Sequence, residues 1–369
     1  MTSTETPDRP RDGALPGYVV VTLGVVLTLA ALFLMHEFRG IVAPVFFALN
    51  LIIAAYPVHR WLVGKGAPAW LAAAVMALTV IVILLVLIAA LVGIINALVG
   101  ELPKYSGQYL TVYNAVKTYL AGLNINIDNI GLSDILAKVN PTTVTGAITA
   151  VYSSASGILG VVAVIAASLV FFAMDAPSVA KRLRIVGIVH PPMGRSFEDF
   201  THGVRRYWIV TTVFGLIVAV LDGVALAILG VPLPVTWAVL SFITNYIPTV
   251  GFVVGVVPPA LLGLFLGGWQ LAVAVVAVYT VLNVVIQVII QPRFTGESVG
   301  VSVTVSFVSL LLWGWVLGPL GTLLALPTTL LVKALLIDVD PKARWVAALI
   351  SSRPDHVLTT PEEDDDDDS

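Results

Sequence analysis

The sequence predicts an all-α, polytopic integral membrane protein with about six to eight membrane segments and two interrupted or re-entrant helical hairpins in its C-terminal half. Of the 369 residues, 58% are hydrophobic and 11% are charged, whereas an ordinary soluble domain has roughly 25% charged residues. Several apolar runs approach or exceed the roughly 20 residues that a helix needs to cross hydrocarbon. Gly, Pro and Asn break the apolar stretch 234–336 at two places, a pattern typical of regions where membrane proteins handle a substrate.

The N-terminal part predicts four membrane-spanning helices and one segment outside the membrane. The first apolar run ends without a small-residue cleavage site, so we expect a retained span and not a signal peptide. A more polar segment after the third run has hydrophobic residues at helical spacing, which indicates a small helical excursion. In order, we expect a disordered N-terminus at 1–17, three transmembrane helices within 18–99, an extracytoplasmic helical segment at 100–146 and a fourth transmembrane helix at 147–174.

The distribution of Lys and Arg predicts which side of the membrane each segment faces. Residues 175–206 combine six Lys and Arg with an apolar helical face, which is typical of a basic amphipathic linker on the membrane surface. Residues 100–146 carry three Lys, each offset by an acid. Since cytoplasmic loops are enriched in Lys and Arg, we expect a cytoplasmic linker and both termini inside. The C-terminus, 338–369, ends in an acidic tail that we expect to be disordered.

The C-terminal membrane core, residues 207–337, contains the two interruptions. Residues 235–247 form at most about 20 Å of helix at 1.5 Å per residue, too short to cross a hydrocarbon core of about 30 Å. The chain breaks at 248–251, and the same design recurs around 318–321. Each region fits either a pair of spans or a re-entrant hairpin, and two hairpins place Arg293 on the cytoplasmic side. In both arrangements the irregular backbone has to be sheltered by protein.

A polar stripe runs along one predicted helix near the end of this core. Asn283, Gln287 and Gln291 are spaced four residues apart and therefore share a helix face. Because amides in hydrocarbon need partners, the stripe is either interhelical glue or a neutral lining for a polar substrate. Together with the residues that break the helices, it defines a candidate substrate pathway of Asn245, Pro248, Gly251, Asn283, Gln287, Gln291, Gly318 and Gly321.

Two further candidate sites contain charged residues. Asp222 is the only acid well inside a predicted span, and a carboxylate there costs roughly 2.5 to 3.5 kcal/mol on the insertion scale. Since burial disfavours the charged form, Asp222 is a candidate for ion coupling; the alternatives are structural pairing or a position nearer the outer interface. The loop after the polar stripe has a predicted structural or gating role and contains Pro292, Arg293, Gly296, Glu297 and Gly300.

The motifs give no support for an enzyme, a cofactor or a metal site. The chain lacks Cys, which excludes thiolate ligands and a Cys nucleophile, and its five His are scattered. A phosphate-binding loop, an HExxH zinc motif and a GxSxG nucleophile motif are all absent from the sequence. Topology explains the basic residues, so nucleic-acid binding has no support. We expect membrane lipids and a small-molecule solute as partners.

The interrupted regions also carry a family resemblance. The segments 245–251, 291–300 and 318–327 read NYIPTVG, QPRFTGESVG and GPLGTLLALP. As a set they resemble the signature blocks of the autoinducer-2 exporter (AI-2E) family of bacterial membrane transporters, and the order of the preceding spans is similar as well. The resemblance implies a homo-oligomeric exporter or permease of the bacterial cytoplasmic membrane that does not hydrolyse ATP. It also implies a link to quorum-signal export or to sodium/proton exchange.

Two function classes fit these observations. The first is a secondary transporter or exporter that moves a small solute by alternating access around the two interruptions. Its solute would be a quorum-sensing signal such as autoinducer-2, or an exchanged ion, with protons or sodium as candidate coupling ions. The alternative is a passive channel or a non-transporting membrane scaffold, whose helix breaks only serve packing. Saturable, gradient-coupled flux in liposomes distinguishes the first class from the second.

Overall fold

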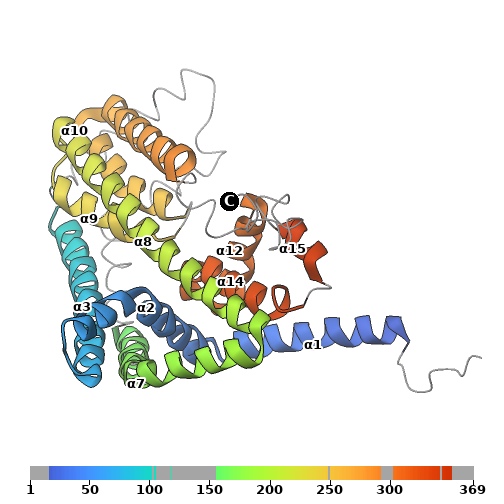
Figure 1. The fold of residues 1–369 in the computed structure, drawn as a ribbon. Helices are drawn as coiled ribbons and strands as arrows, with labels where there is room; N and C mark the ends of the chain where they lie inside the picture. The colour runs from blue at the N-terminus through green and yellow to red at the C-terminus, as the bar shows by residue number, and fades with distance from the viewer. Residues whose placement is uncertain are drawn as a thin grey trace, which may run out of the picture.

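Every regular element in the described part of the chain is helical, as the sequence predicts (Figure 1). The computed structural model describes residues 16–101, 104, 118, 155–247, 250–291, 302–340 and 343–350. The predicted extracytoplasmic segment lies almost wholly outside these residues. Five helical stretches are long and apolar enough to cross a membrane: Arg39–Gly64, Ala69–Leu98, Leu159–Val189, Pro191–Ile228 and Gly251–Gln287. Shorter apolar helices accompany them, so the structure is that of a polytopic membrane protein.

Three helices form the N-terminal part. α1 (Gly17–Glu37) and α2 (Arg39–Gly64) meet at the single residue Phe38, and α1 projects sideways from the other helices (Figure 1). A tight turn leads from α2 into α3 (Ala69–Glu101). This turn contains Gly66, whose φ of 91° suits a residue without a Cβ.

The next two helices are longer than their apolar runs predict. α7 (Ala155–Val189) and α8 (Pro191–Ile228) meet at His190. The segment 175–206 consists of the adjoining ends of α7 and α8, and its position as a cytoplasmic linker on the membrane surface stays a prediction. The break falls at His190 because two prolines follow it, and proline is tolerated in the first turn of a helix, where its missing N–H has no partner in any case.

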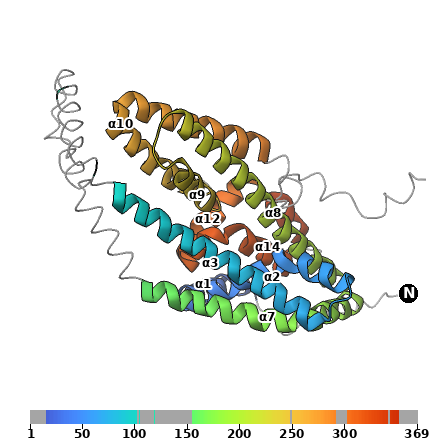
Figure 2. The same cartoon turned by 90° about the vertical axis from the view of Figure 1, so that its left-hand side faces the viewer.

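The first interrupted region is a helical hairpin, called the first hairpin below. It consists of α9 (Pro234–Thr244) and the first arm of α10 (Val250–Asn283), which returns beside α9 (Figure 2). α10 then breaks at Gly267 and Gly268, the latter with φ 70° and ψ −166°, a conformation essentially restricted to glycine. The second arm runs on into the π-helix η3 (Val284–Ile290). With 11 residues, α9 spans only about 16 Å, as short as predicted.

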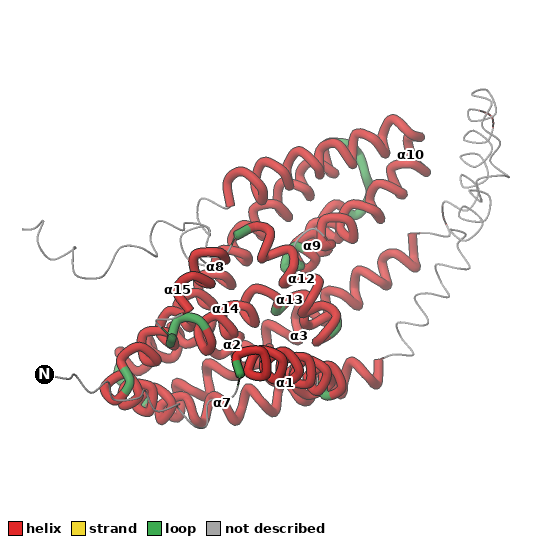
Figure 3. The backbone as a smooth tube through the Cα atoms, turned by 90° about the vertical axis from the view of Figure 1, so that its right-hand side faces the viewer, coloured by secondary structure: helices red, strands yellow, loops and turns green. Residues whose placement is uncertain are grey.

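The second interrupted region is also a hairpin, called the second hairpin below. α12 (Val303–Leu317) ends at Gly318, which has φ 71° and ψ −152°. α13 (Pro319–Leu323) and α14 (Ala325–Leu336) then return along α12, and the short helix α15 (Arg344–Ile350) follows. Figure 3 shows α12, α13 and α14 gathered in the middle of the molecule, next to α8.

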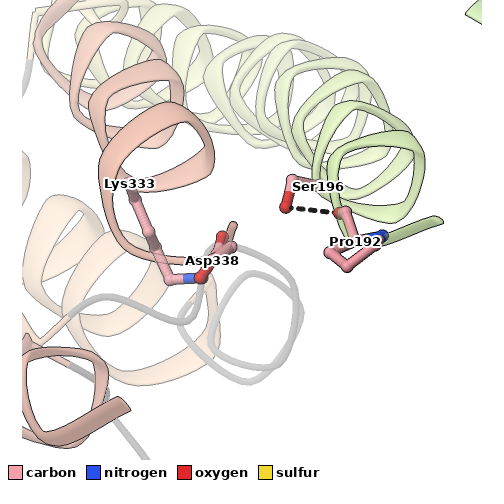
Figure 4. Close-up of polar contacts among 4 residues, drawn as sticks. All are labelled: Pro192, Ser196, Lys333 and Asp338. Atoms are coloured by element: carbon pink, nitrogen blue, oxygen red, sulfur yellow. Dashed lines mark hydrogen bonds and ion pairs between the residues drawn. The ribbon is translucent and has the colours of Figure 1, made fainter. Parts of the chain in front are cut away.

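An ion pair closes the end of the second hairpin. Lys333 on α14 contacts both carboxylate oxygens of Asp338 at 2.8 Å. The pair lies opposite the beginning of α8, where the Ser196 hydroxyl donates to the carbonyl of Pro192 at 3.0 Å (Figure 4). The end of α14 and the start of α8 thus lie at the same end of the bundle.

Three buried apolar clusters hold the bundle together. The largest joins α2, α3, α7, α8 and α14 and includes Met76, Leu169 and Val204. The second packs α9 and α10 against α3 and α8 around Trp237. The third joins α2, α12 and α14 and includes Trp313. Both hairpins are therefore packed into the bundle, as the rule for irregular backbone in membranes requires.

Candidate functional site

Three amide side chains meet at the tip of the first hairpin. Asn245 follows the last residue of α9, and Gln287 lies on η3. Nε2 of Gln287 donates to Oδ1 of Asn245 and, at 2.5 Å, to Oδ1 of Asn283. Asn283 in turn donates to the carbonyl of Tyr279 at 2.8 Å. We call Asn245, Asn283 and Gln287 the amide cluster. It links the hairpin tip to the helix behind it through side chains alone.

Gln287 lies in a π-helical segment, where the sequence predicts a continuous α-helix. In a π-helix the backbone bonds run from residue i to i+5, and such turns are rare and frequent at functional sites. Asn283 and Gln287 are in contact, as the stripe predicts, while Gln291 follows the π-helix and is half-buried. The altered backbone is thus centred on the residue that bonds the hairpin tip.

A second polar group connects α8, α9 and α10. Asp222 on α8 is 0% exposed, and Ser241 of α9 donates to its Oδ2 at 2.6 Å. Tyr279 of α10 is 1% exposed and lies within electrostatic range of Asp222. Among the described residues, neither Asp222 Oδ1 nor the Tyr279 hydroxyl has a hydrogen-bond partner. Since buried polar atoms almost always have partners, these two atoms are the unusual feature of this polar group.

A small hollow lies between these two polar groups. It is too narrow for a water-sized sphere to fit inside it. The hollow is therefore closed in this conformation, and a solute would have to displace the side chains around it. Its lining consists of Ser241, Thr244, Asn245, Gly251, Phe252, Gly255, Tyr279 and Asn283.

Glycines bring the helices around the hollow into close contact. A Cβ on Gly251 would collide with the carbonyl of Thr244, and one on Gly255 would lie 3.1 Å from the Thr244 hydroxyl. A Cβ on Gly223 would come within 2.9 Å of the Ala238 Cβ, so α8 and α9 also touch closely. Small residues permit such approach between membrane helices, and here they place Asp222, the neighbour of Gly223, against α9.

The second hairpin has a tightly packed tip of its own. Gly321 lies against the carbonyl of Trp313 with no room for a Cβ. The Trp313 indole donates to the Thr329 hydroxyl at 3.0 Å, and Thr329 donates to the Ser309 hydroxyl at 2.8 Å. These bonds connect the two arms of the hairpin on either side of the break at Gly318.

The two tips share an apolar core, whereas the polar site belongs to the first. Tyr246 of the first tip and Leu320 of the second pack against the same buried cluster. The Tyr246 hydroxyl is also bonded to Thr212 of α8 at 2.9 Å. The described residues around the hollow all come from α9, α10 and the turn between them.

The structure brings some of the predicted residues together and leaves others undescribed. Asn245, Gly251 and Asn283 line one hollow, Gln287 bonds two of them, and Asp222 adjoins it through Ser241. Gly318 and Gly321 lie in the second hairpin. The sequence positions outside the described residues are Pro248, Pro292, Arg293, Gly296, Glu297 and Gly300, so the gating loop stays a prediction.

Sequence reasoning missed three residues of the site, namely Ser241, Thr244 and Tyr279. Their one available signal was a hydroxyl group within an apolar helix, and most such hydroxyls bond their own helix, as Thr280 does to the carbonyl of Val276. Within the described residues, no group of three or more His, Cys, Asp or Glu side chains could hold a metal ion.

Comparison with known proteins gives a consistent result along the chain. Residues 22–339 match the family described as AI-2E family transporter. The chain is 27% identical over 314 residues to the AI-2 transport protein TqsA of Escherichia coli (strain K12), covering 84% of this chain and 89% of TqsA. It is 27% identical over 335 residues to YhhT of the same organism, covering 89% and 92%. It is 24% identical over 346 residues to YrrI of Bacillus subtilis (strain 168), covering 87% and 95%.

Proposed function

Because this chain belongs to the AI-2E transporter family, we propose that it is a secondary exporter that moves a small polar solute past the first hairpin by alternating access. The observation that carries the proposal is the bond from Gln287 to Asn245. It closes the hollow with neutral side chains, which a solute can replace with its own hydroxyl or carbonyl groups. The hollow then opens when the hairpin tip parts from η3.

The neutral character of the amide cluster indicates the class of solute. A site built from amides and hydroxyls bonds a polar solute without demanding charge, and an apolar analogue would leave these groups unpaired at a cost. TqsA is named as an AI-2 transport protein, which makes AI-2 the first solute to test. An oxygen-rich neutral solute fits the lining of Ser241, Thr244 and Asn245.

We assign ion coupling to Asp222. A carboxyl group buried at membrane depth is costly when charged, and its Oδ1 faces no donor among the described residues. Protonation of Asp222 would remove the charge, and its bond with Ser241 of α9 would then respond to the protonation state. The carboxyl group therefore connects proton uptake to the position of the first hairpin.

Reconstitution into liposomes tests the proposal. We expect saturable AI-2 flux that depends on a pH gradient, and we expect Asp222→Asn to abolish that dependence while the protein still assembles. Thr280→Val is a matched control because Thr280 is exposed and its hydroxyl bonds only its own helix at 2.7 Å. Ohmic conductance would identify a channel, the absence of any flux a scaffold, and a sodium-driven flux insensitive to Asp222→Asn would remove the coupling role.

Membrane placement and assembly complete the proposal. The Lys and Arg distribution favours both termini in the cytoplasm, and the family resemblance favours a homo-oligomer in the bacterial cytoplasmic membrane. Because the chain has no Cys, cysteines introduced singly at positions near each terminus report sidedness directly. Labelling of an intact cell by an impermeant reagent at either end would contradict the proposed orientation.

A further inference from the structure

A cationic patch lies where the N-terminal half of α8 packs against α2, away from the transport site. Arg205 on α8 is half-buried, and its Nε donates to the carbonyl of Ile53 on α2 at 3.5 Å. Arg60, near the end of α2, is exposed and lies within electrostatic range of Arg205. Arg60 and Arg205 thus place two positive charges on the neighbouring helices α2 and α8, and a bound anion would reduce their mutual repulsion.

A recess beside these arginines offers room for such an anion. It has a volume of about 410 Å³ and is open to the surroundings. Charged and polar groups line it, together with the exposed apolar side chain of Ile209. The described residues around the recess are Asp199, His202, Gly203, Arg205, Arg206 and Ile209.

The carboxylate that lines the recess also has charged neighbours outside it. Asp199 lies within electrostatic range of Lys333 and Asp338 on the neighbouring α14 side, and Lys333 is already paired with Asp338 at 2.8 Å (Figure 4). In the part of the chain that the structure describes, neither Arg60 nor Arg205 takes part in an ion pair. Among the described residues that line the recess, two are arginines and one is an aspartate, so positive side chains outnumber negative ones there.

Exposed aromatic side chains near Arg60 are typical of residues at the level of lipid headgroups. Trp61 and Trp70 flank the turn between α2 and α3 and are 58% and 71% exposed. The Lys65 ammonium lies 3.9 Å from the centre of the Trp61 ring. Exposed Trp together with Lys and Arg is typical of the membrane–water interface. Arg60 is adjacent to Trp61 in the chain, so it belongs to the same interfacial layer.

We propose that Arg60, Arg205 and Arg206 bind the phosphate of an anionic phospholipid headgroup, with the lipid's first methylenes against Ile209. Guanidinium groups bind phosphate through paired, charge-assisted hydrogen bonds, and basic pockets between membrane helices on the cytoplasmic side suit such headgroups. Arg205 and Asp222 are 17 residues apart on α8, or about 25 Å, so this site is separate from the hollow and does not depend on the proposed transport function.

Thermal unfolding of the full-length protein in a neutral detergent tests the assignment. We expect phosphatidylglycerol in mixed micelles to raise the Tm, whereas phosphatidylcholine at the same mole fraction does not. Arg205→Gln should weaken the apparent affinity for phosphatidylglycerol by about tenfold, as expected for a lost charge-assisted bond. Arg184→Gln is the matched control, because Arg184 is an exposed arginine of α7 outside the recess.

A second variant and a second ligand complete the test. Arg60→Gln changes an exposed side chain and should also weaken the effect, even if Arg205→Gln fails to fold. Inorganic phosphate alone distinguishes a free anion from a lipid, and an equal rise in Tm with phosphate would overturn the lipid assignment. The assignment is also overturned if phosphatidylcholine stabilises as much, or if both variants respond to phosphatidylglycerol like the unchanged protein.

Discussion

Gln287 ties the tip of the first hairpin to the helix behind it, and Gln287→Leu removes that tie with little change in side-chain volume. The substitution eliminates the bonds from Nε2 to Asn245 and Asn283. It leaves the Oδ1 atoms of both asparagines without this donor. The apolar contacts around η3 can remain, because leucine suits a hydrophobic helix.

The free-energy change expected for Gln287→Leu follows from the two lost hydrogen bonds. Side-chain hydrogen bonds between membrane helices contribute about 0.6 kcal/mol on average and up to about 1.7 kcal/mol, so the loss lies between about 1 and 3 kcal/mol. If the open state of the hairpin lacks these bonds, the substitution shifts the closed-to-open equilibrium by about 5- to 150-fold. The protein should still fold, since the apolar clusters around Trp237 and Val204 are unchanged.

Cysteine accessibility and transport report this shift together. We expect a cysteine introduced at Thr249, between α9 and α10, to react faster with a water-soluble reagent in the Gln287→Leu background. Flux of a polar solute should saturate at a higher concentration, because the solute loses a hydrogen-bonding partner. Thr280→Val, on the same helix, should change neither quantity, since its hydroxyl bonds the carbonyl of Val276 only.

Three outcomes would refute the reasoning on Gln287. Unchanged reactivity and unchanged flux would show that the amide cluster does not close the hollow. Loss of assembly in size-exclusion chromatography, without a defect specific to transport, would show that Gln287 only stabilises the packing between helices. An equal effect of Thr280→Val would mean that any polar loss on this helix disturbs the protein.

Three further substitutions test the site and the second hairpin. Ser241→Ala removes the hydroxyl that donates to Asp222 at 2.6 Å. It should lower the free energy of unfolding by about 1 to 3 kcal/mol and change the pH profile of flux. An identical pH profile contradicts the coupling role. Gly318→Ala forces a Cβ onto φ 71° and ψ −152° and should lower stability by about 1 to 3 kcal/mol, as seen by thermal unfolding. Gly93→Ala, with nothing within 4 Å of its Cβ, should not, and equal losses would refute the backbone argument. Thr329→Val breaks two hydrogen bonds between the arms of the second hairpin and should lower the free energy of unfolding by about 1 kcal/mol. An unchanged Tm would contradict this expectation.

The local features of the fold could be predicted from the sequence because their causes are local. Composition determines that the chain is a membrane protein, and Gly and Pro clustered with Asn predict a helix break, whereas isolated prolines such as Pro44 and Pro177 lie inside helices. The interruptions near Gly251 and Gly318 were therefore predictable to within a few residues. The extent of α7 and α8 was not predictable in this way. The residues between 175 and 206 are too polar to show the apolar pattern of a membrane helix, although the backbone there is helical on both sides of His190.

What the sequence by itself determined is the class of protein and the positions of its broken helices, together with Asp222 and Gln287 as polar groups that need partners. Only the tertiary structure decided which residues are those partners. Asp222 bonds Ser241, 19 residues away in the sequence, and Gln287 bonds Asn245, 42 residues away. The physical reason is that contacts between helices depend on how each helix is rotated and how closely its neighbour approaches. Glycines such as Gly223 and the π-helical turn at Gln287 set those quantities, and neither effect can be calculated from local spacing.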